Sequence, residues 1–346
     1  MLRGTDGERH LKVERAKEIL AGMPCKRVAV FGDLMLDRYI WGRATRISQE
    51  APVPIVAVSR RSAAPGGAAN VLRNIASLGG QAAAYGVIGD DANADDLLAL
   101  LDEQTIEVSG VMRDRARTTT EKTRIIAEHQ QVVRIDVEEY KPIGDAHVRK
   151  VVDQLDGEAA KGALQAIIVE DYNKGMVSEK ALRDIAEVGT RHGIPVALDP
   201  HPGNEACVEG VTILTPNRTE AFAMAGVYLK PPPRPVTDDT ALREVVRILQ
   251  DRWKVRYLLV TLGGDGMALY QNGGPPLHIP TQAKEVFDVS GAGDTVVASF
   301  VLALIAGASA EEAAVISNHA AGVVVGKVGT APVSAEELLE SFQVEE

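Results

Sequence analysis

Hydrophobic and polar positions alternate between two patterns along most of the chain. Short runs rich in β-branched residues predict strands at residues 28–31, 82–88, 166–169, 195–198, 211–214 and 257–261. Between these runs, apolar residues recur at helical spacing, which predicts helices at 67–77, 91–101, 178–192, 238–253, 291–305 and 310–326. Such alternation is typical of βαβ units. We therefore expect a three-layer α/β/α sandwich with a mostly parallel central sheet.

Two regions, 34–61 and 106–137, break this alternation. Thr, Val, Ile and polar residues interleave there with period two, and no helical pattern separates the runs. We expect antiparallel strands that form a small β-sheet lid over the binding edge of a main domain at 27–335. A helical extension at 1–26 and a tail at 336–346 complete the predicted organisation.

The predicted lid also suggests a partner. A few short strands with one apolar face are not stable while exposed, so we expect a homodimer built through the lid sheets. The apolar residues expected near that contact are Ile40, Trp41, Val53, Ile55 and Val56.

Composition and charge exclude several classes of function. A net charge of −11 over 346 residues argues against nucleic acid and anionic membranes as partners. The longest uncharged run, 295–310, is too short to span a bilayer. The two cysteines, Cys25 and Cys207, lack the spacing of a zinc site, and charged residues near the N-terminus do not fit an export signal. We expect a cytoplasmic protein.

The lid segments differ in charge from the rest of the chain. Residues 37–61 and 111–134 each carry a net charge of +3. This charge either keeps an exposed sheet edge soluble or forms a field directed at a phosphorylated ligand. Lys122 and Arg124 are two apart in an extended strand and so face the same side, while Lys174 follows a strand on the far side. We expect these three residues to bind the phosphate of a substrate.

Residues 288–294 place small residues immediately before a long apolar helix. The amides of Gly291, Ala292 and Gly293 would point outward at the helix N-terminus and form an anion hole for a phosphoryl group. Asp294, in the first turn, could accept a proton from an attacking hydroxyl. The alternative is a tight strand-to-helix turn in which Asp294 is only a capping carboxylate.

Two further glycine clusters are candidates for ligand binding. Gly66 and Gly67 open a helix and would let a polyol approach closely, while Asn70 supplies a donor and an acceptor. The turn at 261–266 could hold a nucleotide, although a plain hairpin explains it equally well. Neither a P-loop nor a Gly-x-Gly-x-x-Gly motif occurs, which excludes Walker-type and dinucleotide-binding enzymes.

Asn217 and Glu220 lie one turn apart where a helix follows a strand. A carboxylate at Glu220 could hold Mg²⁺ through water between nucleotide phosphates. The alternative is that Glu220 completes an N-terminal capping box.

Together these motifs resemble the ribokinase-like (PfkB) carbohydrate kinases from about residue 27 to 335. The resemblance rests on the Gly66-Gly67…Asn70 element and the Gly-Ala-Gly-Asp294 element, in that order. Within the family, the chain is most similar to the heptose 7-phosphate kinases of lipopolysaccharide inner-core synthesis. The segments that carry this similarity are 32–39, 46–54, 65–71, 74–79, 130–136 and 171–175.

The resemblance implies a ribokinase-like fold and ATP-dependent phosphorylation of D-glycero-β-D-manno-heptose 7-phosphate at O1. It implies ATP and Mg²⁺ as cofactors and leaves open whether a monovalent cation is needed. Asp294 would be the base, and Gly291, Ala292 and Gly293 the anion hole. ATP would contact Asn217, Arg218, Thr219, Glu220, Thr261, Gly263, Gly266 and Asn318. The sugar would contact Asp33, Gly66, Gly67 and Asn70.

Two departures and two alternatives accompany this resemblance. His201 stands where the family usually has lysine, and Asn173 where a smaller residue is common. A kinase of another sugar or sugar phosphate is the first alternative. The second, a non-catalytic sugar-binding regulator, would be expected to lose the Asp294 carboxylate, which is retained.

No His-x-Gly-His motif occurs, so we expect no nucleotidyltransferase activity from these residues.

Overall fold

The computed structural model of the protein describes residues 11–343 except 129, 234, 272–273 and 284. Within these residues, nine strands form one sheet in the order β13-β12-β11-β10-β9-β8-β1-β4-β5. Seven neighbouring strands, from β11 to β5, pair in parallel, and β12 and β13 add an antiparallel edge. The strands are β1 (Arg27–Gly32), β4 (Gln81–Ile88), β5 (Glu107–Arg113), β8 (Ala166–Glu170), β9 (Val196–Asp199), β10 (Ile213–Leu214), β11 (Tyr257–Thr261), β12 (Met267–Gln271) and β13 (Leu277–Ile279).

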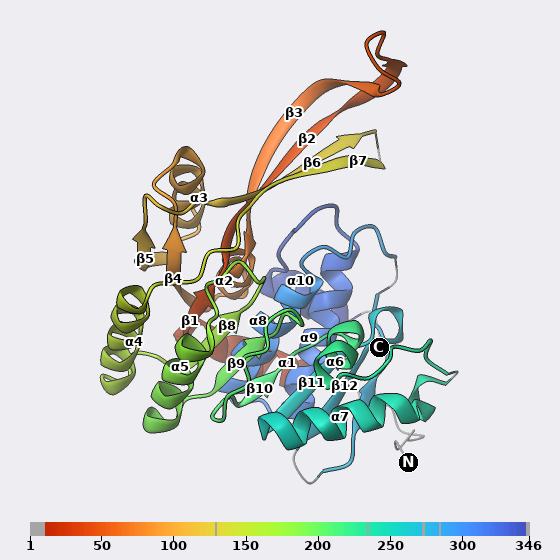
Figure 1. Ribbon diagram of the computed structural model, residues 1–346. Helices are drawn as coiled ribbons and strands as arrows, with labels where there is room; N and C mark the ends of the chain where they lie inside the picture. The colour runs from red at the N-terminus through yellow and green to blue at the C-terminus, as the bar shows by residue number, and fades with distance from the viewer. Residues whose placement is uncertain (1–10, 129, 234, 272–273, 284, 344–346) are drawn as a thin grey trace.

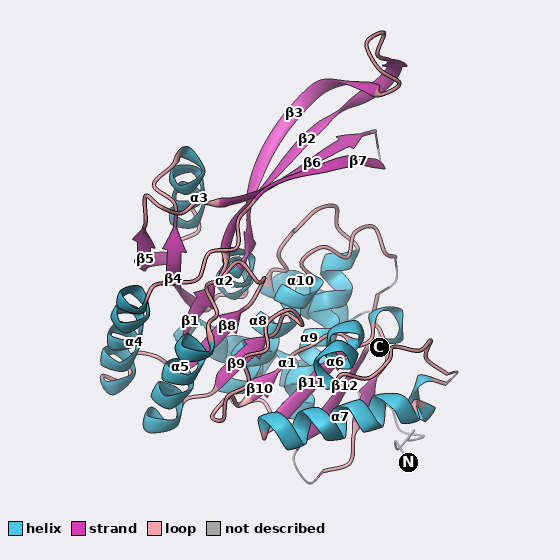
Figure 2. Cartoon of the chain, in the orientation of Figure 1, coloured by secondary structure: helices cyan, strands magenta, loops and turns pink. Residues whose placement is uncertain are grey.

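Helices cover both faces of this sheet (Figures 1 and 2). One core cluster includes residues of α1 (Val13–Gly22), α2 (Ala68–Ser77), α3 (Ala92–Asp102), α8 (Ala292–Ile305), α9 (Ala310–Val325) and α10 (Ala335–Gln343). The other includes residues of α4 (Asp145–Ala160), α5 (Glu179–His192), α6 (Arg218–Ala225) and α7 (Thr240–Trp253). The expected three-layer α/β sandwich is confirmed.

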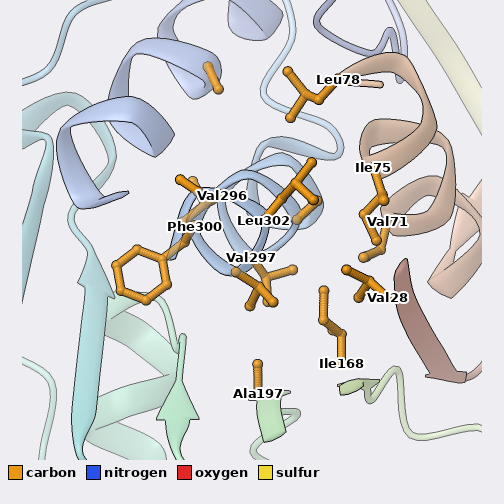
Figure 3. Packing of buried hydrophobic residues seen from close by; sticks show 14 of the residues in the cluster. Val28, Val71, Ile75, Leu78, Ile168, Ala197, Val296, Val297, Phe300 and Leu302 are labelled. Carbon is orange, nitrogen blue, oxygen red and sulfur yellow. The ribbon is translucent and has the colours of Figure 1, made fainter. Parts of the chain in front are cut away.

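The alternation of side chains along each strand builds the two cores. In β1, Val28 and Val30 pack into the first cluster, and Ala29 and Phe31 pack into the second. Helix α8 lies in the middle of the first cluster, with Phe300 among its buried side chains (Figure 3). Because α8 is buried from Asp294 to Ala303, its uncharged residues from Thr295 onward serve packing. Among the described residues, no helix has the length and hydrophobicity to cross a membrane.

Both ends of the described chain belong to the main domain. Ile19 of α1 and Phe342 of α10 are buried in the same cluster as α8. The predicted boundaries at 27 and 335 therefore divide segments that pack into one hydrophobic core. The sequence analysis predicted no helix at the C-terminal end, where α10 lies. Residues 1–10 and 344–346 of the predicted extension and tail lie outside the described residues.

A second sheet, the lid, extends away from the main sheet (Figure 1). Its order is β3-β2-β6-β7, formed by β2 (Leu34–Ile47), β3 (Pro54–Gly67), β6 (Thr120–Ala127) and β7 (Gln130–Val137). The pairs β2–β3 and β6–β7 are antiparallel, as expected, but β2 and β6 pair in parallel.

The second lid segment begins at 120 rather than 106. Residues 107–113 form β5, which pairs in parallel with β4 at the edge of the main sheet. The physical reason is the crossover helix α3: a strand, a helix and a following strand form a βαβ unit whose two strands lie in one sheet. The prediction that residues 106–119 belong to the lid was therefore wrong.

Candidate active site

The carboxyl ends of the parallel strands bring polar side chains to one edge of the main sheet. Asp33 follows β1, Asp171 and Tyr172 follow β8, Asp199 ends β9 and Thr215 follows β10. The first turn of α8 and the start of α2 lie at the same edge, where Asp294 and Asn70 meet through a hydrogen bond. Residues far apart in sequence thus form one polar site beneath the lid.

Asp294 is buried and held from two sides. Its Oδ2 accepts a hydrogen bond of 2.7 Å from Asn70 Nδ2, and its Oδ1 accepts one of 2.8 Å from the Tyr172 hydroxyl. Burial raises the pKa of Asp294 to about 6, while these two hydrogen bonds act to lower it. The arrangement fixes the direction of the carboxylate and gives it a basicity suited to proton transfer near neutral pH.

The three predicted anion-hole residues precede Asp294 at the N-terminus of α8. Gly291 has φ of +78°, and a Cβ there would lie 2.6 Å from Asn70 Nδ2, so the close approach requires glycine. Gly293 is exposed beside the buried Asp294, and the amide of Ala292 donates to the Val289 carbonyl at 3.3 Å. The helix N-terminus and the carboxylate are thus adjacent, and the anion-hole role remains a prediction.

Two more carboxyl groups converge on Asp294. Carboxylate oxygens of Glu170, Asp199 and Asp294 lie within 4.8 Å of one another. Burial raises the pKa of Glu170 well above its usual range, and it raises that of Asp199 to about 8. In the described part of the chain, Glu170 Oε2 has no hydrogen-bond partner. Carboxylate oxygens are the ligands that Mg²⁺ prefers, so this cluster has the chemistry to face the divalent cation of a bound nucleotide.

Asp33 has a structural role in the loop after β8, and its predicted contact with a sugar remains a prediction. Its carboxylate accepts hydrogen bonds from the backbone amides of Tyr172, Lys174 and Met176, which ties the loop after β8 to the end of β1. Burial raises the pKa of Asp33, and the amides act to lower it. Asp33 thereby positions Tyr172, which the sequence analysis missed although it lies two residues after the buried strand β8.

The predicted glycines at 66 and 67 are needed where the lid joins the main domain. A Cβ on Gly66 would lie 2.8 Å from the Asp37 carboxylate. Gly67 has φ of +56°, and a Cβ there would lie 2.6 Å from the Asp33 carbonyl oxygen. These contacts explain the glycines by packing, and they leave the predicted contact with a sugar untested.

The predicted nucleotide residues gather at the N-terminus of α6 and the turn after β11. Asn217 and Thr261 form an isolated parallel bridge, which brings the two segments together. Asn217 and Glu220 form the capping box that was the alternative to a magnesium role, and Thr219 is exposed beside them. Burial raises the pKa of Glu220, whose charge in turn raises that of Asp199. Glu220 therefore lies close to the acidic cluster while it caps the helix.

The other predicted nucleotide residues have structural partners. Arg218 forms a 2.6 Å ion pair with Asp239, and Asn318 Nδ2 donates to the Pro280 carbonyl at 2.6 Å. Gly263 and Gly266, with φ of +60° and +85°, shape the tight turn between the antiparallel strands β11 and β12. The hairpin interpretation of this turn is confirmed, and contact with a nucleotide remains a prediction.

The basic residues predicted to bind a phosphate separate into two groups. Arg124 forms a 2.7 Å ion pair with Asp37, and both side chains are largely buried. Lys122 and Lys174 instead both contact Glu138, at 3.8 Å and 2.8 Å. Removal of Arg124 would leave a buried carboxylate without its counter-ion, so lost binding in such a variant would not identify a phosphate contact.

Part of the positive charge assigned to the lid is neutralised within the fold. Arg38 pairs with Glu121 and with Asp96, which lies outside the two basic segments. Arg113 pairs with Asp95 at the end of β5, outside the lid. These contacts weaken the basic field expected of the lid.

A helix N-terminus rich in glycine, a buried carboxylate of raised pKa and nearby acidic groups have the chemistry that phosphoryl transfer requires. The pfkB family carbohydrate kinase model matches residues 26–337. The chain belongs to this family and is a sugar kinase.

Known proteins similar to this chain agree with that assignment. It is 42% identical over 313 residues to the bifunctional protein HldE of Geobacter sulfurreducens, and 41% identical over 316 residues to that of Syntrophotalea carbinolica. These matches cover 90% and 91% of the chain but only 62% and 63% of the relatives. The chain thus spans less than two thirds of the length of these curated relatives.

Solved structures support the fold. Phosphofructokinase-2 from Escherichia coli in complex with potassium has a TM-score of 0.74 at 19% identity, covering 92% of this chain and 98% of that one. Arabidopsis thaliana ribokinase complexed with ribose and ATP has a TM-score of 0.67 at 21% identity, with the same coverage. The ribokinase-like fold expected from the sequence is confirmed.

Proposed function

We propose that the protein transfers the γ-phosphoryl group of ATP to O1 of D-glycero-β-D-manno-heptose 7-phosphate and forms the 1,7-bisphosphate. The observation that carries the proposal is Asp294, held by Asn70 and Tyr172 beside the N-terminus of α8. The similarity to HldE proteins over 90% of the chain supports a heptose rather than another sugar. The product would enter ADP-heptose synthesis for the lipopolysaccharide inner core.

The chemistry follows from the positions of these groups. Asp294 accepts the proton of the sugar hydroxyl while the oxygen of that hydroxyl attacks the γ-phosphorus of ATP. The bond from this phosphorus to the bridging oxygen of ADP breaks. The amides at Gly291 to Gly293 would face the migrating phosphoryl group, whose charge the α8 dipole also stabilises. Bound with the nucleotide, Mg²⁺ supplies positive charge that offsets the phosphates. Glu220 would hold it through water, with Asp199 and Glu170 nearby.

Other features of the site extend this proposal. The lid over the strand ends would keep water from the γ-phosphate and so limit ATP hydrolysis. We still expect the enzyme to act in the cytoplasm, because ATP and sugar phosphates are available there. A monovalent cation is a further candidate cofactor, because one phosphofructokinase-2 structure is a complex with potassium.

A substrate panel tests the proposal against its first alternative. ATP consumption is measured with C5 to C7 sugars and their terminal phosphates as acceptors. We expect the highest kcat/KM for the heptose 7-phosphate. Higher kcat/KM for a different sugar or sugar phosphate would favour the alternative, and no transfer to any acceptor would favour a non-catalytic regulator.

The raised pKa of Asp294 predicts the pH dependence of turnover. The base acts only when ionised, so kcat is expected to fall as the pH drops through about 6, the pKa of Asp294. The Tyr172 hydroxyl donates to this carboxylate and lowers the pKa. The variant Tyr172→Phe should therefore move the acid limb of the kcat profile to higher pH. An acid limb at the same pH in both proteins would show that Tyr172 does not tune the base.

We also propose that the lid sheets form a homodimer. Of the five residues expected at that contact, Val53 is exposed and the others are half-buried. The lid also exposes Ile47, Val58, Val132, Val133, Ile135 and Val137. Apolar side chains in such number on one small sheet favour a covering partner. Light scattering at micromolar concentration should give twice the mass of one chain, and the mass of a single chain would contradict the dimer.

A further inference from the structure

Two lysines from different parts of the fold meet at one acidic residue. Lys122 lies in lid strand β6, and Lys174 lies in the loop after β8 of the main domain. Glu138, directly after lid strand β7, contacts Lys174 Nζ through Oε1 at 2.8 Å and Lys122 Nζ through Oε2 at 3.8 Å. The side chains of the two lysines are only 16% and 18% exposed, and that of Glu138 is 30% exposed. Glu138 therefore separates two largely buried positive charges.

This cluster lies one tyrosine side chain away from the base. Lys122 Nζ lies over the Tyr172 ring, 5.8 Å from its centre, and the hydroxyl of that ring donates to Asp294. A heptose 7-phosphate also carries its reacting hydroxyl, at O1, and its phosphate on different carbons, C1 and C7. A substrate with O1 at Asp294 can thus direct its phosphate toward the two lysines.

The third basic residue of the cluster contributes little charge. His201 lies near both lysines, and burial together with their positive charges lowers its pKa. Its imidazole is therefore mostly neutral at pH 7, although the family usually has a lysine at this position. The two lysines are the groups that an incoming anion would meet, and Glu138 already contacts both.

We propose that Glu138 is a displaceable counter-ion, which holds the anion position between Lys122 and Lys174 until the phosphate of the substrate replaces it. The inference rests on the proposed function and adds to it a residue that competes with every anion at the phosphate position. The Glu138 carboxylate is attached to the chain and therefore competes for the lysines at a high effective concentration. A free anion such as inorganic phosphate displaces it poorly for this reason. A sugar phosphate displaces it because contacts to the sugar add to the binding. Glu138 thus keeps small anions out of the site.

The variant Glu138→Gln removes the charge and nearly preserves the shape. Its binding is measured by titration calorimetry at low ionic strength, without ATP, with inorganic phosphate and with heptose 7-phosphate as probes. We expect both to bind about fivefold more tightly, the upper range for loss of one partly exposed ion pair, while binding of unphosphorylated heptose is unchanged. A purely structural ion pair predicts the opposite, because its loss would disorder the lysines and weaken anion binding.

A neighbouring residue offers the matched control. Glu139 accepts a hydrogen bond from the Thr118 amide, so Glu139→Gln makes the same change in charge one position away. This control should leave the affinity for both phosphates within about twofold, the change expected of a surface charge. If Glu138→Gln does not fold, Glu138→Asp keeps the charge but shortens its reach, and partial tightening is then expected.

The two proposals fail in different ways. Unchanged or weaker phosphate binding by the Glu138 variants, with heptose 7-phosphate still a substrate, would overturn the counter-ion role alone. Tighter binding of inorganic phosphate by Glu138→Gln, with heptose 7-phosphate not phosphorylated by the unaltered protein, would support the counter-ion role and reject the proposed substrate.

Discussion

Replacement of Asp294 by asparagine is expected to lower kcat by at least about 10²-fold, the low end for loss of a positioned general base. The carboxylate is the group of raised pKa beside the N-terminus of α8, and it accepts hydrogen bonds from both Asn70 and Tyr172. Asparagine has the same shape but cannot take up the proton of the sugar hydroxyl. Its single carbonyl oxygen also cannot accept from both donors in the present geometry.

Affinity for ATP separates this chemical role from a structural one. Asp294 is assigned to the acceptor hydroxyl, so the dissociation constant for ATP, measured by calorimetry, should remain nearly unchanged in Asp294→Asn. An unchanged thermal unfolding midpoint would show that the variant is folded. Turnover near that of the unaltered protein would remove Asp294 from its assigned role as the base.

The second large effect is expected at Gly291. An added Cβ would lie 2.6 Å from Asn70 Nδ2, and φ is +78° at this position. Gly291→Ala must therefore displace either the N-terminus of α8 or the Asn70 amide that holds Asp294. We expect kcat to fall by about 10²-fold, comparable to loss of one donor from an oxyanion hole.

Gly307 provides the control for backbone strain. Its φ is +100°, and a Cβ there would meet no atom within 4 Å. Gly307→Ala thus has the roughly 1–2 kcal/mol cost of a left-handed residue without a clash at the site. It should lower the thermal midpoint, by less than Gly291→Ala because it adds no clash, and leave kcat intact. Equal loss of kcat in both variants would show that general destabilisation, and not displacement of Asn70 or of the N-terminus of α8, lowers kcat in Gly291→Ala.

Local sequence patterns predicted the features that depend on neighbouring residues. The glycine turn and the apolar helix around Asp294 follow one another within a short segment, so their order alone indicated a helix N-terminus beside a carboxylate. The same holds for the capping box of Asn217 and Glu220 and for the alternating strands and helices of the main domain. Propensity and periodicity act over such distances.

Features that depend on distant residues were not predictable in this way. Tyr172 and Asp294 are 122 positions apart, and no periodic pattern indicates that their side chains meet. The parallel pairing of β2 with β6 is likewise a tertiary contact. Charge counted along the sequence suggested a basic lid, because it did not show that Arg38 also pairs with Asp96, which lies outside the counted segments. Glu138 was missed for the same reason: its two lysines come from two different parts of the fold.

Phosphorus NMR of a reaction with ATP and D-glycero-β-D-manno-heptose 7-phosphate tests the central claim most directly. The proposed function predicts that ATP is converted to ADP while a new phosphate ester appears at O1 and the 7-phosphate resonance persists, at a rate far above that with the unphosphorylated heptose. Absence of the 1,7-bisphosphate, or equal kcat/KM for the phosphorylated and unphosphorylated heptose, would contradict it.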